Sequence, residues 1–177
     1  SKDGICNLAP YSFFNGVAEK PHYVVIGSAG VKDTLRNIRD NGEFVCSMAT
    51  YELRDHMNMT SAAVPHGVDE FPLAGLTATK SHFVAPPRVK ESPAAFECRL
   101  FQTLYLPGAG KYDQSYTLII GLVVGIYIDE RFIKDGRVDT AAMQPIARLG
   151  YMDYSVVRSD TIFSINRPDV GPDGKIA

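Results

Sequence analysis

Alternating apolar and polar residues predict two long β-strands in the second half of the sequence. The first covers residues 94–106, and the second covers the mostly apolar residues 116–129 beyond a loop with glycine and proline. The alternation in the first strand predicts two opposite faces: Phe96, Cys98, Leu100 and Leu104 on one, and Glu97, Arg99, Thr103 and Tyr105 on the other. We therefore expect a long hairpin whose second arm is covered on both faces, as in a barrel wall that also meets another subunit.

Two shorter apolar runs, residues 22–27 and 43–49, are predicted as further strands. Strands therefore outnumber helices, and the C-terminal half lacks the strand–helix alternation of a doubly wound parallel sheet. These patterns predict a mainly β fold with peripheral helices. Periodicity by itself does not distinguish a β-barrel from a β-sandwich.

Two helices are expected in the first half of the chain. The first covers residues 32–41 and ends at Gly42, and the second runs from residue 51 to about residue 64, with Thr50 as its N-cap. Their apolar contacts are predicted to be Leu35 and Ile38 in the first helix, and Leu53, Met57 and Val64 in the second.

Composition narrows the class of protein. The 177 residues fit one domain, and a net charge of −2 gives no electrostatic reason to expect nucleic acid or a membrane surface as partner. The longest apolar run, residues 118–128, contains two glycines and is too short for a membrane-spanning helix. We see no targeting segment. Three cysteines without a CxxC motif predict reduced thiols in a cytoplasmic protein, and four scattered histidines suggest no metal site.

An uncharged segment near the N-terminus, residues 7–15, combines aromatic with small polar residues. A flat amphipathic ring needs such a wall, because its faces are apolar and its edge forms hydrogen bonds. An irregular strand followed by a turn accounts for the same composition. Taken by itself, the composition of this segment favours the irregular strand over a wall that binds a ring.

A strand, a glycine turn and a helix N-terminus follow one another over residues 28–37. The first amides of a helix lack intrahelical partners, and Lys32 and Thr34 add a cation and a hydroxyl there, which suits a phosphate monoester. The glycine spacing is not that of a P-loop. An ordinary capped helix with Lys32 and Arg36 in solvent is the alternative.

Two further segments are candidates for ligand contacts. Asn58, Thr60 and Ser61 place polar groups where they weaken a helix, although they would equally well end it before Pro65. The tyrosines of residues 151–154 could cover a planar ligand or pack as a rim loop. No arrangement of nucleophile and base is visible, so we expect no catalytic side chain and a bound cofactor that carries the reaction.

In their order, these segments resemble the flavin reductase-like family within the FMN-binding split-barrel group. The matching blocks are NLAPYSFFN, KDTLRNI with GEFV, MNMTSA, GVDEF with LAGLT, ESPAAFECRL, IIGLVVGIYID and RLGYMDY. The resemblance covers nearly the whole chain and implies one split β-barrel domain over residues 1–177, paired as a homodimer with a flavin in each interface cleft. Relatives usually carry an opening strand before this first block. Two alternatives are open: the residues of that strand are absent from the sequence above, or the barrel lacks one wall strand.

The resemblance also implies which residues contact the flavin. Those along the ring and ribityl chain are Ala9, Pro10, Tyr11, Ser12, Phe13 and Asn15; those near the phosphate are Ser28, Lys32, Asp33, Thr34 and Asn37; those from the dimer side are Asn58, Thr60, Ser61 and Tyr154.

The implied activity is hydride transfer from NADH or NADPH to FMN, with FAD as the alternative flavin. Such a protein serves as a flavin reductase, for example as the reductase component of a two-component monooxygenase. A flavoredoxin-like carrier, which holds FMN and exchanges electrons with a redox protein, is the main rival. A split barrel that binds a different ligand is the third alternative.

Overall fold

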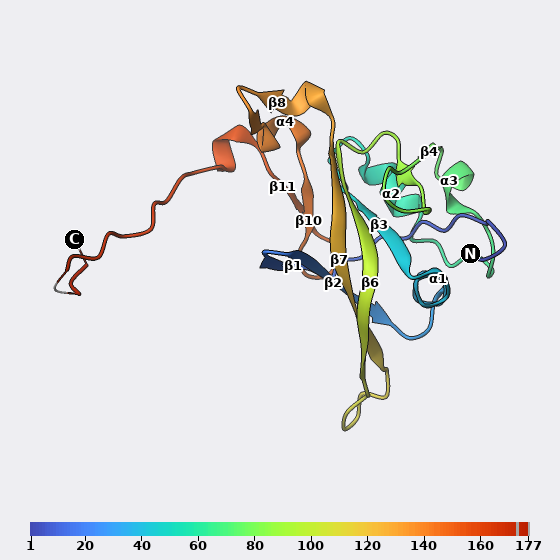
Figure 1. Ribbon diagram of the computed structural model, residues 1–177. Helices are drawn as coiled ribbons and strands as arrows, with labels where there is room; N and C mark the ends of the chain where they lie inside the picture. The colour runs from blue at the N-terminus through green and yellow to red at the C-terminus, as the bar shows by residue number, and fades with distance from the viewer. Residues whose placement is uncertain (173, 177) are drawn as a thin grey trace.

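A five-stranded antiparallel sheet forms the centre of the molecule in the computed structural model, which describes residues 1–172 and 174–176 (Figure 1). The order of the strands across the sheet is β1-β2-β7-β6-β3. Their bounds are Phe14–Glu19 for β1, His22–Ala29 for β2, Glu43–Ser47 for β3, Ala94–Leu106 for β6 and Tyr116–Ile128 for β7. The mainly β prediction and the four predicted strands are therefore confirmed.

Strands β6 and β7 form the predicted long hairpin, but two irregularities interrupt their register. Cys98 pairs with Val123 and Leu100 with Gly121, whereas the register shifts between Leu100 and Gln102. Phe101 is the extra residue at this shift. A β-bulge of this kind reverses the side-chain alternation of the strand beyond it.

The prediction that Leu104 shares the inner face with Cys98 is therefore wrong. Beyond the bulge, Thr103 pairs with the fully buried Ile119, and Leu104 is 48% exposed on the other face. Tyr105 changes face together with Thr103 for the same reason. Strict alternation holds only for Phe96, Cys98 and Leu100.

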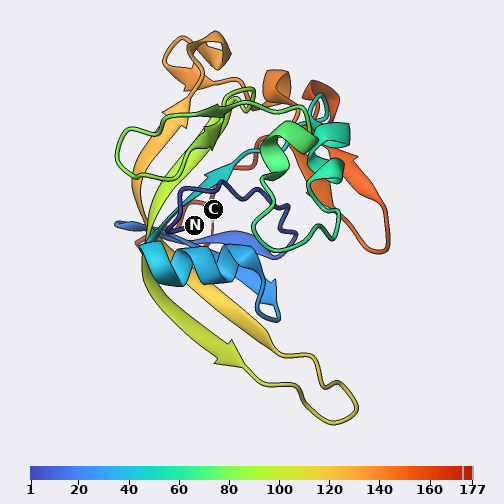
Figure 2. The same ribbon diagram turned by 90° about the vertical axis from the view of Figure 1, so that its right-hand side faces the viewer.

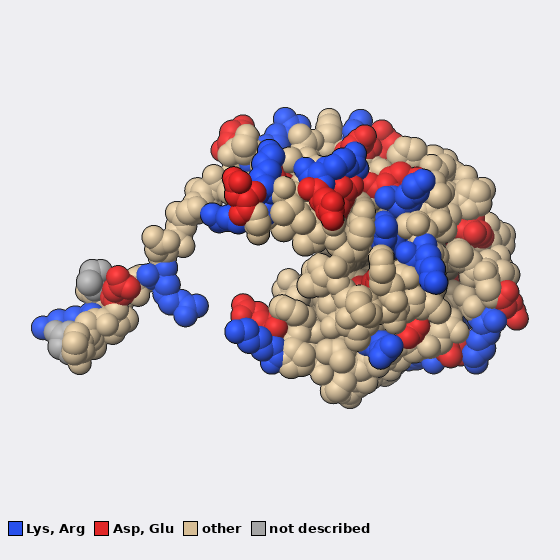
Figure 3. Space-filling view, turned by 45° about the horizontal axis from the view of Figure 1, so that its top comes forward, with Lys and Arg blue, Asp and Glu red and all other residues tan. Residues whose placement is uncertain are grey.

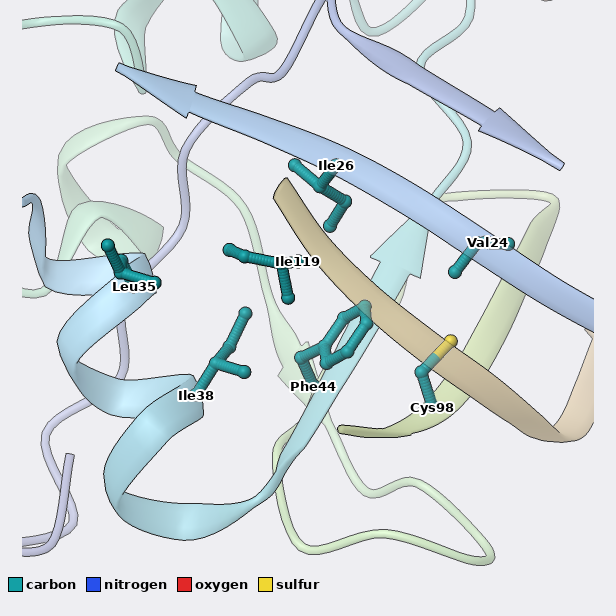
Figure 4. Close-up of a cluster of buried hydrophobic side chains, with 7 residues drawn as sticks. All are labelled: Val24, Ile26, Leu35, Ile38, Phe44, Cys98 and Ile119. Carbon is teal, nitrogen blue, oxygen red and sulfur yellow. The ribbon is translucent and has the colours of Figure 1, made fainter. Parts of the chain in front are cut away.

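Helix α1 (Asp33–Asn41) packs against the inner face of the sheet through Leu35 and Ile38, the two apolar contacts predicted for it. Leu35 and Ile38 are buried, and the helix ends at Gly42, whose left-handed backbone (φ 73°) donates its N–H to Ile38 O at 2.8 Å. The two helix residues complete a core cluster with five sheet residues, shown in Figure 4: Val24, Ile26, Phe44, Cys98 and Ile119.

The second predicted helix is shorter than expected. Helix α2 covers only Arg54–Met59, and none of its residues is buried. Thr50 does cap the preceding turn, since its Oγ1 accepts a hydrogen bond from Leu53 N at 3.3 Å. At the other end, the hydroxyls of Thr60 and Ser61 donate to carbonyls three residues back and end the helix.

The remaining elements are short and lie around the sheet: α3 (Glu70–Leu73), β4 (Ala78–Thr79), β5 (Arg88–Val89), η1 (Glu130–Phe132), β8 (Ile133–Lys134), β9 (Arg137–Val138), α4 (Thr140–Met143), β10 (Ile146–Arg148), β11 (Tyr154–Val156) and η2 (Ser159–Thr161). Beyond η2 the chain extends away from the body (Figure 1). None of the described helices is long and apolar enough to cross a bilayer.

Candidate functional site

A cavity of about 970 Å³ lies between the N-terminal segment, α1, β3 and β10. Its volume is at the upper end of the range of small-molecule sites, about 300–1,000 Å³. In Figure 2 the N-terminal segment, in dark blue, passes between α1 and the region of α2 and α3. Most of the lining is uncharged, with Glu43 and Arg148 as its charged residues among the described ones.

Four of the predicted ring contacts line this cavity, namely Ala9, Pro10, Tyr11 and Ser12. The other two lie outside it. Phe13 is 65% exposed and its ring meets Tyr116 edge-on, while Asn15 belongs to β1 and pairs with Val25. The structure therefore brings residues 9–12 to the cavity, but not Phe13 or Asn15.

At the start of α1, Thr34 and Asn37 line the cavity, whereas Lys32 is exposed outside the lining. Thr34 Oγ1 accepts a hydrogen bond from Asn7 Nδ2 at 2.9 Å. Within the described part of the chain, no side chain caps this helix terminus. The amides of its first turn therefore still lack the partner that an N-cap residue usually supplies.

Asp33 is engaged within the protein and does not line the cavity. Its carboxylate accepts hydrogen bonds from His66 Nδ1 at 2.7 Å, Arg36 at 2.8 Å and Gly67 N at 3.2 Å. Partial burial by itself would raise the pKa of Asp33, but these hydrogen bonds together hold its pKa below the ordinary value. Asp33 thus fastens the loop at residues 66–67 to α1.

Ser28 also lies behind the lining rather than in it. It is fully buried in β2, and its Oγ lies 3.5 Å from the hydroxyl of Tyr11. Because Tyr11 faces the cavity, Ser28 supports a lining residue from behind.

From the α2 side, only one of the three predicted residues reaches the cavity. Thr60 lines it and is buried, with its hydroxyl donating to Met57 O at 2.8 Å. Asn58 and Ser61 are exposed and do not line it.

Tyr154 of β11 lines the cavity together with Arg148 of β10. The Arg148 guanidinium donates to the Tyr154 hydroxyl at 3.2 Å and lies 5.2 Å from the centre of its ring. Arg148 also donates to the carbonyl oxygen of Tyr151, whose side chain is 93% exposed. Arg148 therefore holds the 149–153 turn at the edge of the cavity.

Asn7 and Glu70 support this region although neither was among the predicted flavin contacts. Asn7 lies in the quoted first block, but only its contact with Thr34 shows that it supports the site. Glu70 is buried and accepts the N–H of Leu8 from 62 residues away. Nothing in the local sequence around Glu70 signals this partner.

The cysteines show no metal-binding arrangement, and no cluster of three or more metal-ligating side chains occurs in the described residues. Cys6 and Cys46 are half-buried and line the cavity, while Cys98 is fully buried. A hydrogen bond with Cys98, together with burial, raises the pKa of the Cys46 thiol well above its ordinary value. All three thiols are free, as predicted.

Comparison with known proteins gives a consistent result. A family model described as "Flavin reductase like domain" matches residues 1–151. Among relatives, the chain is 38% identical to an uncharacterised protein of Aquifex aeolicus, covering 87% of this chain and 78% of that protein. It is 30% identical to the protein YwrF of Bacillus subtilis, covering 95% and 83%.

The comparison with solved structures is consistent with the family match. Component B of nitrilotriacetate monooxygenase from Bacillus cereus superposes with a TM-score of 0.85 at 32% identity, covering 93% of this chain and 82% of the other. The 2-nitrobenzoate 2-nitroreductase of Pseudomonas fluorescens gives 0.81 at 28% identity, covering 97% and 84%. A protein of Shewanella frigidimarina with a split barrel domain gives 0.80 at 22% identity, covering 94% and 81%, a likeness of fold.

Proposed function

The chain belongs to the flavin reductase-like domain family, and from this premise we propose that it binds FMN in the cavity and transfers hydride to it from NADH or NADPH. The family match confirms the resemblance predicted from the ordered sequence blocks. FAD is the alternative flavin. The observation that carries the proposal is the cavity itself, because an uncharged wall meets an uncapped helix terminus there.

The residues present fit the phosphate of FMN. The first-turn amides of α1 lack a side-chain cap, and the helix dipole adds partial positive charge at the same point. Thr34 supplies a hydroxyl and Asn37 an amide from the same helix. Lys32 is at the N-cap position, where its exposed ammonium adds positive charge near a phosphate without lining the cavity.

The ring of FMN fits the wall formed by residues 9–12. Ala9 and Pro10 offer apolar surface, and Tyr11 and Ser12 offer hydroxyls to a polar edge. Thr60 and Tyr154 approach from two other elements. We assign these residues to flavin binding, whereas Phe13, Asn15, Asn58 and Ser61 would contact it only if a second subunit or a rearrangement brought them near.

The chain needs no acid or base for this reaction. Bound FMN would supply the hydride-accepting N5 atom, so the protein's part is to bind, orient and exclude water. The mostly uncharged lining suits that part.

We further propose a homodimer. The sheet face opposite the core carries Tyr23, Phe101 and Leu104, of which Phe101 is 61% exposed and lies 5.2 Å from the Tyr23 ring centre. Figure 3 shows a hollow on one side of the molecule whose wall has few charged side chains. A second copy on these surfaces would cover apolar area that a monomer leaves in water. Light scattering measures the mass directly.

The Bacillus cereus relative is component B of a monooxygenase, and this supports a role as the reductase that supplies reduced flavin to such a partner. A cytoplasmic location accords with three free cysteines. The rival is a carrier like flavoredoxin, which has a similar fold at 21% identity.

Spectroscopy and turnover test the proposal. Purified protein, alone or after incubation with FMN, should show the absorbance of bound oxidised flavin and should oxidise NADH or NADPH when free FMN is added. Bound, reducible flavin without turnover would favour the carrier. Protein that binds no flavin would overturn both functions.

The phosphate assignment has its own test. Lys32→Ala combined with Thr34→Ala should weaken binding of FMN much more than binding of riboflavin, which has no phosphate. Equal losses for the two ligands would contradict the assignment.

A further inference from the structure

Glu70, the first residue of α3, is a buried acidic residue, and among the described residues Leu8 is the one hydrogen-bond partner of its carboxyl group outside α3. It is 7% exposed, and its Oε2 accepts the backbone N–H of Leu8 at 2.9 Å. Over residues 1–172 and 174–176, Glu70 forms no ion pair with a basic side chain. A buried carboxyl group is costly unless it is hydrogen-bonded, so the contact with Leu8 is what makes this position tolerable.

Leu8 directly precedes residues 9–12, the part of the cavity wall that is assigned to the flavin ring. Residues 1–13 precede the first strand and belong to no helix or strand, so few contacts determine the path of this segment. Asn7 binds α1 through Thr34, and Phe13 O accepts from Gly27 N at 2.8 Å. The bond from Leu8 to Glu70 ties the segment to the opposite side, where α3 lies.

Hydrogen bonds at both ends fix the position of helix α3. Asp69 caps it by accepting from Phe71 N at 2.9 Å, and His56 Nδ1 lies 2.6 Å from the carbonyl oxygen of Ala74 at its other end. Phe71 is buried and lines the cavity. Glu70 therefore projects from a fixed element, and it can hold a segment that has no regular structure of its own.

We propose that Glu70 is a positioning residue for flavin binding, which acts by holding residues 8–12 in place as the wall of the cavity. This proposal rests on the proposed function for its consequence in flavin affinity. Its structural premise, that Glu70 immobilises the N-terminal segment, can be measured without flavin.

Two variants separate the hydrogen bond from the shape of the side chain. Glu70→Met keeps a similar volume but removes the acceptor, and Glu70→Gln keeps a carbonyl oxygen that can accept from Leu8 N. Fluorescence titration should show FMN and riboflavin both bound about tenfold more weakly by Glu70→Met, the loss expected for one hydrogen bond to a charged group. Glu70→Gln should restore affinity to within about threefold of the wild type.

A matched control uses the neighbouring acidic residue. Asp69→Ala removes the cap of the same helix but leaves the Leu8 contact, so it should lower thermal stability with little change in flavin affinity. Titrations are made at a temperature where circular dichroism shows every variant folded. If Glu70→Met and Asp69→Ala lower stability equally and neither changes flavin affinity, Glu70 is merely structural and the proposal is overturned.

The flavin-independent measurement follows the thiol of Cys6, two residues before Leu8. Cys6 should react with a thiol reagent several-fold faster in Glu70→Met than in the wild type or Glu70→Gln, with the modified peptide identified by mass spectrometry. An unchanged rate would contradict the premise. If the rate rises but the wild type binds no flavin, the proposed function fails while the positioning of the segment by Glu70 stands.

Discussion

Asn7 Nδ2 donates a hydrogen bond to Thr34 Oγ1 at 2.9 Å, joining two cavity-lining residues that are 27 positions apart. Because the amide occupies an acceptor position of the hydroxyl, the hydrogen of Thr34 remains available as a donor. A phosphate group offers only acceptors when it is fully ionised, so this arrangement suits the proposed phosphate end of the site.

We expect Asn7→Asp to weaken FMN binding selectively. A carboxylate at this position would accept the hydrogen of Thr34 and would also repel a phosphate, so the affinity for FMN should fall roughly tenfold or more. The affinity for riboflavin should change much less. Isothermal titration calorimetry with both ligands measures the ratio. Asn166→Asp is the matched control, since it makes the same substitution at an exposed position in the segment after η2.

A double-mutant cycle tests whether Asn7 acts through Thr34. Asn7→Ala should reduce the preference for FMN over riboflavin in the wild type but have little further effect in a Thr34→Val background. Additive effects of the two substitutions would show that the residues act independently.

The pH dependence of stability should reflect Asp33. Its pKa is lower in the folded protein than its ordinary value of about 3.9, so its contribution to stability is present above that pH and is lost as the pH falls through the folded pKa. Asp33→Asn should therefore lower the free energy of unfolding at neutral pH and make it less sensitive to acid. Urea unfolding at several pH values between about 7 and about 3 checks both effects; parallel curves for the two proteins would contradict the role of Asp33.

Close packing around Gly121 makes a small substitution costly. A Cβ atom there would collide with the Phe44 ring and would lie 3.3 Å from Cys98 Cβ, both in the core. Gly121→Ala should lower the free energy of unfolding by about 1–3 kcal/mol, the range for an overpacked core. Gly16→Ala is the control, since apart from its two chain neighbours no described residue places an atom within 4 Å of the added Cβ. Equal stability of the two variants in denaturant unfolding would show that the core accommodates the methyl group.

The rate of thiol labelling tests whether FMN binds in the cavity. Cys46 lines the cavity and its pKa is raised, so it should react slowly with thiol reagents in the free protein. Saturating FMN should slow it further, while Cys98, buried behind it, should stay unreactive until the protein unfolds. Faster labelling of Cys46 in the presence of FMN would argue that the flavin lies elsewhere.

Local patterns in the sequence determined most of the framework. The strand over residues 94–106, the apolar strand after it and the short helix ended by Gly42 were all predicted from neighbours within a few residues, and the structure has each of these elements. The prediction of α2 was too long because Thr60 and Ser61, polar residues compatible with a helix end, turn their hydroxyls back on the preceding carbonyls.

The tertiary structure decided the rest. The bulge at Phe101 places Leu104 on the exposed face of β6. This bulge arises from the pairing of β6 with β7, so the sequence of β6 by itself does not predict it. The candidate site depends likewise on partners distant in the chain. Ordered blocks predicted a flavin site and several residues that line the cavity, but only the fold shows that Asn7 meets Thr34 and that Glu70 meets Leu8. Such contacts follow from the path of an irregular segment through space, and no local periodicity encodes that path.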